Sequence, residues 1–250
     1  MGIFSRLTHA HHRAWELLRG PLFWWFIPAF VLNALVVLLV VYVVNHFADW
    51  IYDEVVVWGA PNEQVKEFLI DLEPMRQLVT FFVVVQVVKY LALIVMGPVY
   101  ALVSEHAETK LTGVRSPFSL KKFVNELIRG IRSAFLLAGI EYGMYGLIFV
   151  ITMFYPLGGM VALIPAWIVG VWAFGAAAMD YVWERDGLGA RQAFLATLKR
   201  PIMAFGVGLP FAIWMSIPIP VISTVTGPLI GGMSAAAMAA VVLKDPEING

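Results

Sequence analysis

The chain has 250 residues and no cysteine, which excludes disulfides, thiolate metal sites, iron–sulfur clusters and cysteine nucleophiles. Charged side chains are also scarce, at 14% of the residues against roughly 25% in soluble domains. Hydrophobic residues make up 60%, which leaves too little polar surface to cover a soluble globule of this size. The formal net charge is zero, so the charge balance does not point to nucleic acid as a partner. This composition indicates an integral membrane protein.

Two apolar segments are long enough to cross a bilayer as single helices, because a span needs about 20 apolar residues. Residues 22–44 carry no charged side chain, and residues 78–103 carry only Lys89. The first segment is too long for the apolar region of a signal peptide, and no small-residue cleavage site follows it. We therefore expect an uncleaved span there and a second span over 78–103.

Lysine and arginine are distributed unevenly around these spans. Residues 1–19 hold three arginines and residues 105–132 hold six basic side chains, whereas residues 49–77 hold seven acids and two bases. Cytoplasmic loops are enriched in Lys and Arg, so we expect a cytoplasmic N-terminus, 49–77 outside and 105–132 inside. Residues 184–200 carry four more bases and are also expected inside.

Two longer apolar blocks, about 133–180 and 201–243, are each interrupted near the middle. The first breaks at Pro156-Leu157-Gly158-Gly159 and the second at Ile217-Pro218-Ile219-Pro220. Because proline removes a backbone donor, each block is predicted to be a helical hairpin. Either hairpin could cross the bilayer twice or turn inside it, and the short halves of the second favour partial penetration. Interrupted segments of this kind often form the solute sites of transporters.

Residues 119–132 are predicted to form an amphipathic helix on the inner leaflet, with basic side chains opposite the apolar face. The apolar face consists of Leu120, Phe123, Val124, Leu127, Ile128 and Ile131. The expected fold is thus an all-α integral membrane protein with a single membrane domain over 1–250. It has two long transmembrane helices and two hairpins of shorter helices, whose depth the sequence leaves open.

Small residues recur at three- or four-residue steps in both hairpins, and such stripes let helices approach closely in lipid. One stripe is Ala166, Gly170, Ala173 and Ala177, and the other is Gly231, Ala235 and Ala239. We expect them to pack inside the chain, with a seam between copies of a homo-oligomer as the alternative.

Lys89 and Glu141 are the only charged residues inside the apolar segments. Ionisable side chains at this depth are costly and face protein or water. Three interpretations stay open: a buried Lys89–Glu141 ion pair, a lysine that reaches the interface along its aliphatic stem, and a place on a solute path. Glu105 and Glu108 share a helix face, as either a solvated helix end or a brace for arginines near a pore mouth.

No motif supports catalysis or a cofactor. The Gly232-Met233-Ser234-Ala235 segment faintly resembles an intramembrane serine protease motif, but no histidine lies inside a span to act as its base. His9, His11 and His12 have no acidic or cysteine ligand nearby, so we expect a flexible tail and no metal site. The chain is predicted not to be an enzyme.

Three segments together resemble the CysZ-type sulfate permease family, which is grouped with the etoposide-induced membrane proteins. The strongest runs from Gly97-Pro98 through the two acids to Leu111-Thr112-Gly113. The second is Ala178-Met179-Asp180-Tyr181, followed by a basic segment and a proline-rich hairpin, and the third is Pro21 to Asn33. The resemblance covers roughly residues 15–243.

The resemblance implies an inner-membrane helical protein that forms homo-oligomers, with inverted arrangement in the family, and takes up sulfate for cysteine synthesis. The family places sulfate-associated arginines just after the proline that opens the first span. Here that stretch reads Pro21-Leu22-Phe23-Trp24-Trp25, and Arg19 is the nearby arginine.

We therefore expect a multi-pass protein of the bacterial inner membrane that transports a small solute, an inorganic anion such as sulfate, by a channel-like or ion-coupled route. Arg19 and Lys89 are the candidate anion contacts, and the candidate supporting or pore-mouth residues are Glu105, Glu108, Glu141 and Asp180. The alternative is a non-transporting membrane scaffold or stress-response protein that acts through helix–helix contacts.

Overall fold

The computed structural model describes residues 2–59, 64, 73–114, 120–153, 158–217, 219 and 222–249. All secondary structure in these ranges is helical, which confirms the expected all-α membrane fold. The elements in chain order are α1 (Ile3–Arg19), η1 (Phe23–Trp25), α2 (Phe26–Gly59), α4 (Glu73–Val95), α5 (Gly97–Thr112), α6 (Leu120–Met153), α7 (Gly158–Arg185), α8 (Ala190–Leu198), α9 (Pro201–Met215), the π-helix η2 (Ile222–Gly232), α10 (Met233–Lys244) and α11 (Pro246–Asn249).

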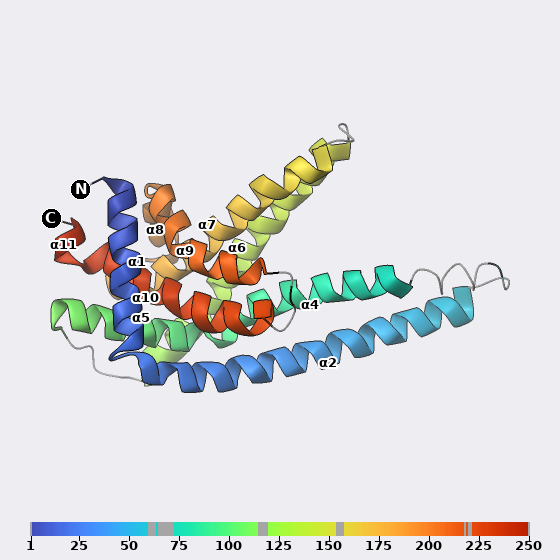
Figure 1. Cartoon of the computed structure of the whole chain (residues 1–250), viewed down its shortest axis with the longest axis horizontal. Helices are drawn as coiled ribbons and strands as arrows, with labels where there is room; N and C mark the ends of the chain where they lie inside the picture. The colour runs from blue at the N-terminus through green and yellow to red at the C-terminus, as the bar shows by residue number, and fades with distance from the viewer. Residues whose placement is uncertain are drawn as a thin grey trace.

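Two antiparallel helix pairs extend from a common body. Figure 1 shows α2 with α4 as one pair and α6 with α7 as the other, diverging from a body that contains α1, α5, α9 and α10. The main buried core lies in this body and includes Tyr100, Phe174 and Phe211. Near the far end of the first pair, an ion pair of 2.7 Å between Arg76 Nη1 and Asp49 Oδ1 holds α2 to α4.

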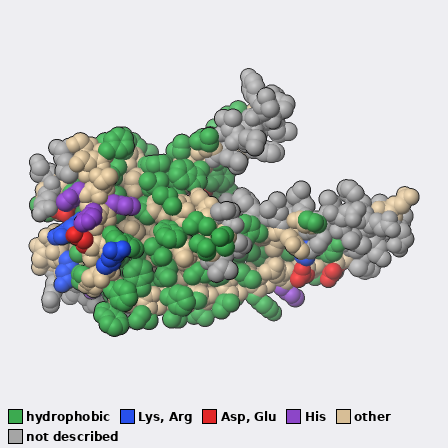
Figure 2. Space-filling view, viewed as in Figure 1, with side chains coloured by type: hydrophobic (Ala, Val, Ile, Leu, Met, Phe, Trp, Pro, Cys, Tyr) green, Lys and Arg blue, Asp and Glu red, His purple; other side chains and the backbone are tan. Residues whose placement is uncertain are grey.

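The surface is apolar over the middle of the molecule. Figure 2 shows charged and histidine side chains at the end that carries α1, and a second charged group toward the far end of the α2–α4 pair. Among the described residues, three helical stretches are long and apolar enough to cross a membrane: Phe23–Glu54, Ile164–Arg185 and Ile222–Lys244. A broad apolar zone between two charged ends is the surface expected of a protein solvated by lipid.

The first span matches its prediction, but α2 is longer than expected. It has 34 residues, or about 51 Å of helix, whereas the hydrocarbon core measures about 30 Å. Residues 49–59, expected in an outer loop, continue this helix.

The second predicted span, 78–103, is not one uninterrupted helix. It is divided between α4 and α5 at Met96. Pro98 has no N–H, so the carbonyl of Ile94 loses its helical donor, and a new helix starts at Gly97. The break places the residues after 96 in the body and those before it in the α2–α4 pair (Figure 1).

The predicted interfacial helix 119–132 does not end at 132. The helix begins at Leu120 and continues without interruption to Met153, so the amphipathic segment and the first half of the hairpin form one 34-residue helix, α6. The hairpin breaks do fall where prolines and glycines predict them: α6 ends at Met153 and α7 begins at Gly158, while α9 ends at Met215 and η2 begins at Ile222.

The N-terminal segment is not a flexible tail. Residues 3–19 form α1, which packs against α10 through an apolar face. The sequence feature that indicates this helix is the spacing of its buried residues, Ala10, Ala14, Leu17 and Leu18. Because these recur at three- and four-residue steps, the histidines are carried on a helix with one face toward the core.

The small residues of the second stripe pack inside the chain, as expected, and so do Ala173 and Ala177 of the first, whereas Ala166 and Gly170 are half-buried. Ala235, Ala236, Ala239 and Ala240 on α10 are all buried within the described structure. The α7 and α9 backbones approach so closely that a Cβ on Gly208 would lie 2.0 Å from the Val171 carbonyl oxygen.

Candidate functional site

One face of α5 carries a line of polar side chains from the charged end of the molecule into its apolar part. Tyr100, Ser104 and Glu108 are spaced four residues apart, so they lie above one another on the helix. Ser104 and Tyr100 are buried. The line faces α7 and α10, which both contact α5.

At the charged end, Glu108 holds basic side chains from two other helices. Arg185 of α7 donates from Nε to Glu108 Oε2 over 2.7 Å and from Nη2 to Ser104 Oγ over 2.8 Å. Lys244 of α10 lies 3.3 Å from Glu108 Oε1 and also pairs with Asp186. The Arg185 side chain is only 8% exposed and that of Glu108 is 19% exposed. We call these five residues the Glu108 cluster; it ties α5, α7 and α10 together.

Deeper along the same line, the irregular backbone of η2 is satisfied by side chains from other helices. η2 is a π-helix that contains Pro228, which supplies no N–H, so its backbone hydrogen bonds differ from those of a regular α-helix. Asn33 of α2 donates from Nδ2 to the carbonyl oxygens of Thr224 (3.3 Å) and Val225 (3.0 Å). The Tyr100 hydroxyl donates to the Pro228 carbonyl oxygen over 2.7 Å.

One polar atom of the Asn33 side chain makes no hydrogen bond to the described residues. Its side chain is fully buried, and Oδ1 has no hydrogen-bond partner among the described residues. A buried acceptor without a partner is costly, so the two donor bonds from Nδ2 must offset that cost.

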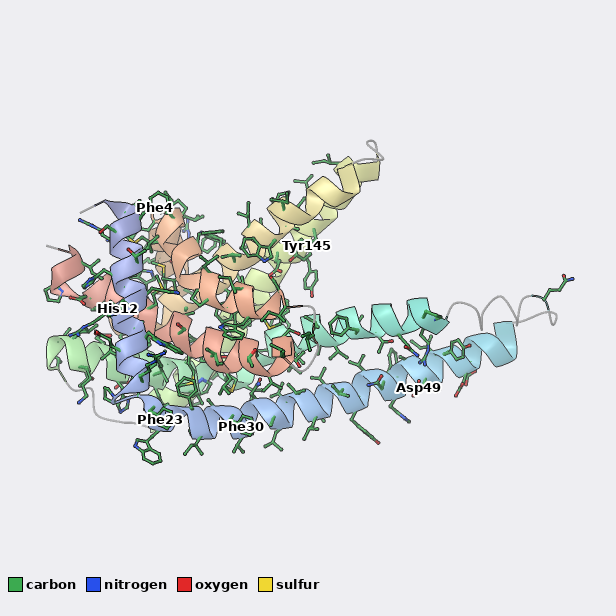
Figure 3. The ribbon with its side chains drawn as sticks, in the orientation of Figure 1. Phe4, His12, Phe23, Phe30, Asp49 and Tyr145 are labelled. Atoms are coloured by element: carbon green, nitrogen blue, oxygen red, sulfur yellow. The ribbon has the colours of Figure 1, made fainter. Side chains whose placement is uncertain are left out.

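Glu141 is buried on α6, where two tyrosine hydroxyls donate to its carboxylate. Tyr90 of α4 donates to Oε2 over 2.6 Å, and Tyr145 of α6 donates to Oε1. Figure 3 labels Tyr145 on the α6–α7 pair. A carboxylate that accepts two hydroxyl hydrogen bonds is stabilised in its charged form.

The described structure includes the side chain of one of the two proposed anion contacts, Arg19. Arg19 is exposed at the end of α1, and its guanidinium lies 5.0 Å from the centre of the Trp15 ring. Lys89 is on α4, but its side chain lies outside the described residues, so its pairing with Glu141 stays a prediction.

The remaining predicted residues lie in different surroundings. Glu108 contacts Arg185, as a brace for an arginine would, although a pore mouth stays a prediction. Glu105 is half-buried on α5, and Asp180 lines a groove between α6, α7 and α8.

Metal-ligating side chains do not gather anywhere in the described part of the chain. His11 instead places Nδ1 3.0 Å from the Met238 sulfur, and burial lowers the pKa of its ring. His9 and His12 are carried on the same helix.

Sequence reasoning missed Arg185, Ser104, Asn33 and Tyr100 as site residues. The spacing of Tyr100, Ser104 and Glu108 was visible, but the helices that meet this face were not. For Asn33 the signal was an amide within an otherwise apolar span, which requires a hydrogen-bond partner from another helix.

The helices and their buried polar contacts define a multi-pass membrane protein built from long helices and interrupted hairpins. Over residues 10–225 the chain matches the family described as sulfate transporter CysZ/etoposide-induced protein 2.4. The chain belongs to this family, which is a family of transporters and not of enzymes. A comparison with curated proteins finds no match.

Proposed function

We propose that this chain carries a small inorganic anion, such as sulfate, across the bacterial inner membrane, by a channel-like or ion-coupled route. Membership of the transporter family over residues 10–225 is the observation that carries the proposal. The irregular, π-helical backbone of η2 supports it, because non-α-helical backbone at depth often forms transporter solute sites.

Arg19 is the proposed first contact for the anion. It is exposed just before the turn that leads into α2, and its guanidinium is stacked on Trp15. A guanidinium recognises tetrahedral oxyanions through paired N–H donors, and Lys89 would supply a second positive charge along α4. Glu105, Glu108, Glu141 and Asp180 are proposed as supporting acids that hold basic side chains or line the route.

A homo-oligomer and a cytoplasmic N-terminus are also part of the proposal. The three arginines of residues 1–19 support this orientation. The alternative, a scaffold that binds partners through its small-residue stripes, loses its strongest surface because Ala235, Ala239 and their neighbours on α10 are buried within the chain.

The test is uptake of labelled sulfate into proteoliposomes that contain the purified protein. We expect uptake above that of empty vesicles. In Arg19→Gln, the sulfate concentration for half-maximal uptake should rise about tenfold, the value of a charge-assisted hydrogen bond. Arg13→Gln is the matched control, because Arg13 is also an exposed arginine on α1.

Uptake equal to that of empty vesicles would remove the sulfate assignment. Equal effects of Arg19→Gln and Arg13→Gln would remove Arg19 from the route and leave transport itself in place.

A further inference from the structure

A groove of about 100 Å³ lies between α6, α7 and α8. Its walls are almost entirely apolar, and alanines on α7 and α8 leave the space that larger side chains would fill. The apolar wall residues are Leu136, Ala176, Ala177, Ala190, Ala193 and Phe194. This surface takes no part in the Glu108 cluster or in the η2 contacts.

Two tryptophans of α7 outside the groove contact groove-lining residues of α8 and fix α8 against α7. The Trp183 indole Nε1 donates to Thr197 Oγ1 over 3.2 Å, and Thr197 in turn donates to the Ala193 carbonyl oxygen. The Trp172 and Phe194 rings pack edge to face with centroids 6.0 Å apart. Because these contacts hold α8 in place, the alanine-lined space does not close.

The groove lies at the level where two neighbouring helices change from charged to apolar. Arg132 is the last basic residue of α6 before a stretch in which Glu141 is the only charge, and Asp180 is the first charged residue after that stretch on α7. Both line the groove. Since α6 and α7 are neighbours, a change from charged to apolar at the same level of both is expected at a membrane–water interface.

Arg132 and Asp180 are the two charged residues that line the groove, and Arg132 supplies its positive charge. Its side chain is exposed, and its guanidinium makes no hydrogen bond or ion pair within the described part of the chain. Next to it, α8 exposes Leu195 and Leu198 beside basic residues, as expected of a short helix in the headgroup region.

We propose that this groove binds a membrane phospholipid, with the phosphate at Arg132 and the upper part of one acyl chain along the alanine wall. An apolar wall next to one exposed guanidinium is complementary to an amphiphile. A small hydrated dianion such as sulfate would gain nothing from the apolar wall and would lose hydration there. The inference does not depend on which solute the protein transports.

The test is native mass spectrometry of the full-length protein in detergent, with phosphatidylglycerol as the probe. Arg132→Gln should weaken lipid retention about fivefold, the contribution of one basic side chain at a membrane surface. Ala190→Leu should weaken retention as well, because this exposed alanine lines the groove and a larger side chain would occupy it. Arg191→Gln is the control, since Arg191 is an exposed base on α8 outside the groove and should retain lipid as the wild type does.

Three results would overturn the proposal. One is equal retention by the wild type and Arg132→Gln. Another is displacement of the lipid from the wild type by excess inorganic sulfate, which would make the site one for a free anion. The third is unchanged retention by Ala190→Leu with an unaltered elution profile, because the acyl chain would then lie elsewhere.

Discussion

Removal of the Glu108 carboxylate should destabilise the protein far more than removal of an exposed acid. In Glu108→Ala, Arg185 loses its only charged partner among the described residues, while its side chain is 8% exposed. Removing one partner of a buried ion pair costs about 3–5 kcal/mol. Lys244 keeps Asp186, and Arg185 keeps its bond to Ser104, so we expect the lower end, about 3 kcal/mol.

The assay is thermal unfolding in detergent, followed by tryptophan fluorescence at one fixed scan rate. For a chain of this size each kcal/mol shifts the midpoint by roughly 2–4 °C, so Glu108→Ala should lower it by about 6–12 °C. Asp49→Asn is the control: the Asp49 side chain is 60% exposed and that of Arg76 is 28% exposed. An exposed pair contributes about 1 kcal/mol or less, so the control should shift the midpoint by a few degrees at most.

A second substitution separates the charge effect from loss of packing. In Glu108→Ala with Arg185→Met, the uncompensated buried charge is gone, so the double variant should recover part of the lost stability. Equal shifts in the midpoint for Glu108→Ala and Asp49→Asn would refute the reasoning. It would also be refuted if the effects of Glu108→Ala and Arg185→Met on the midpoint simply added in the double variant.

Two further substitutions test the packing and the η2 contacts in the same assay. Asn33→Ala should cost about 1–3 kcal/mol, because one buried and one partly buried carbonyl of η2 lose the hydrogen bond from Asn33. Asn45→Ala removes only an exposed bond within α2 and should be close to neutral. Equal effects of the two substitutions would contradict the role of Asn33. Gly208→Ala should destabilise the protein by about 1–3 kcal/mol, because the new Cβ would overlap the backbone of α7. At Gly143, a new Cβ would have no atom within 4 Å, so Gly143→Ala should stabilise the protein by about 0.5–1 kcal/mol. Effects of the same sign would contradict the close approach of α7 and α9.

Composition and charge distribution were enough to predict the helical membrane fold. A lipid-facing surface must be apolar, and a spanning segment must satisfy its own backbone hydrogen bonds, which a helix does. Proline and glycine also located both hairpin breaks, since the loss of a backbone donor is a local effect. Pro98 also removes a backbone donor, but the prediction did not take it into account and treated 78–103 as one helix. The end predicted for the amphipathic helix at 132 was wrong, because a change in polarity along a helix does not require a change in backbone direction.

The candidate site was harder to predict because its contacts join helices that are far apart in the sequence. Glu108 was selected for its spacing from Glu105, yet its partners come from α7 and α10. Asn33 and Thr224 are separated by 191 residues. Periodicity shows which residues share a face of one helix, but it does not show which helix covers that face.

The side chains that satisfy η2 limit how this protein can change conformation. In hydrocarbon, each unsatisfied carbonyl costs several kcal/mol, so separating α2 from η2 would be opposed by the loss of both Asn33 bonds. These two helices should consequently travel as one rigid unit during any cycle of opening and closing. The regular helix is interrupted at Met96, so α4 and α5 can change their relative angle there with fewer helical hydrogen bonds to break, as long as α6 moves with α4 and keeps the Tyr90–Glu141 hydrogen bond.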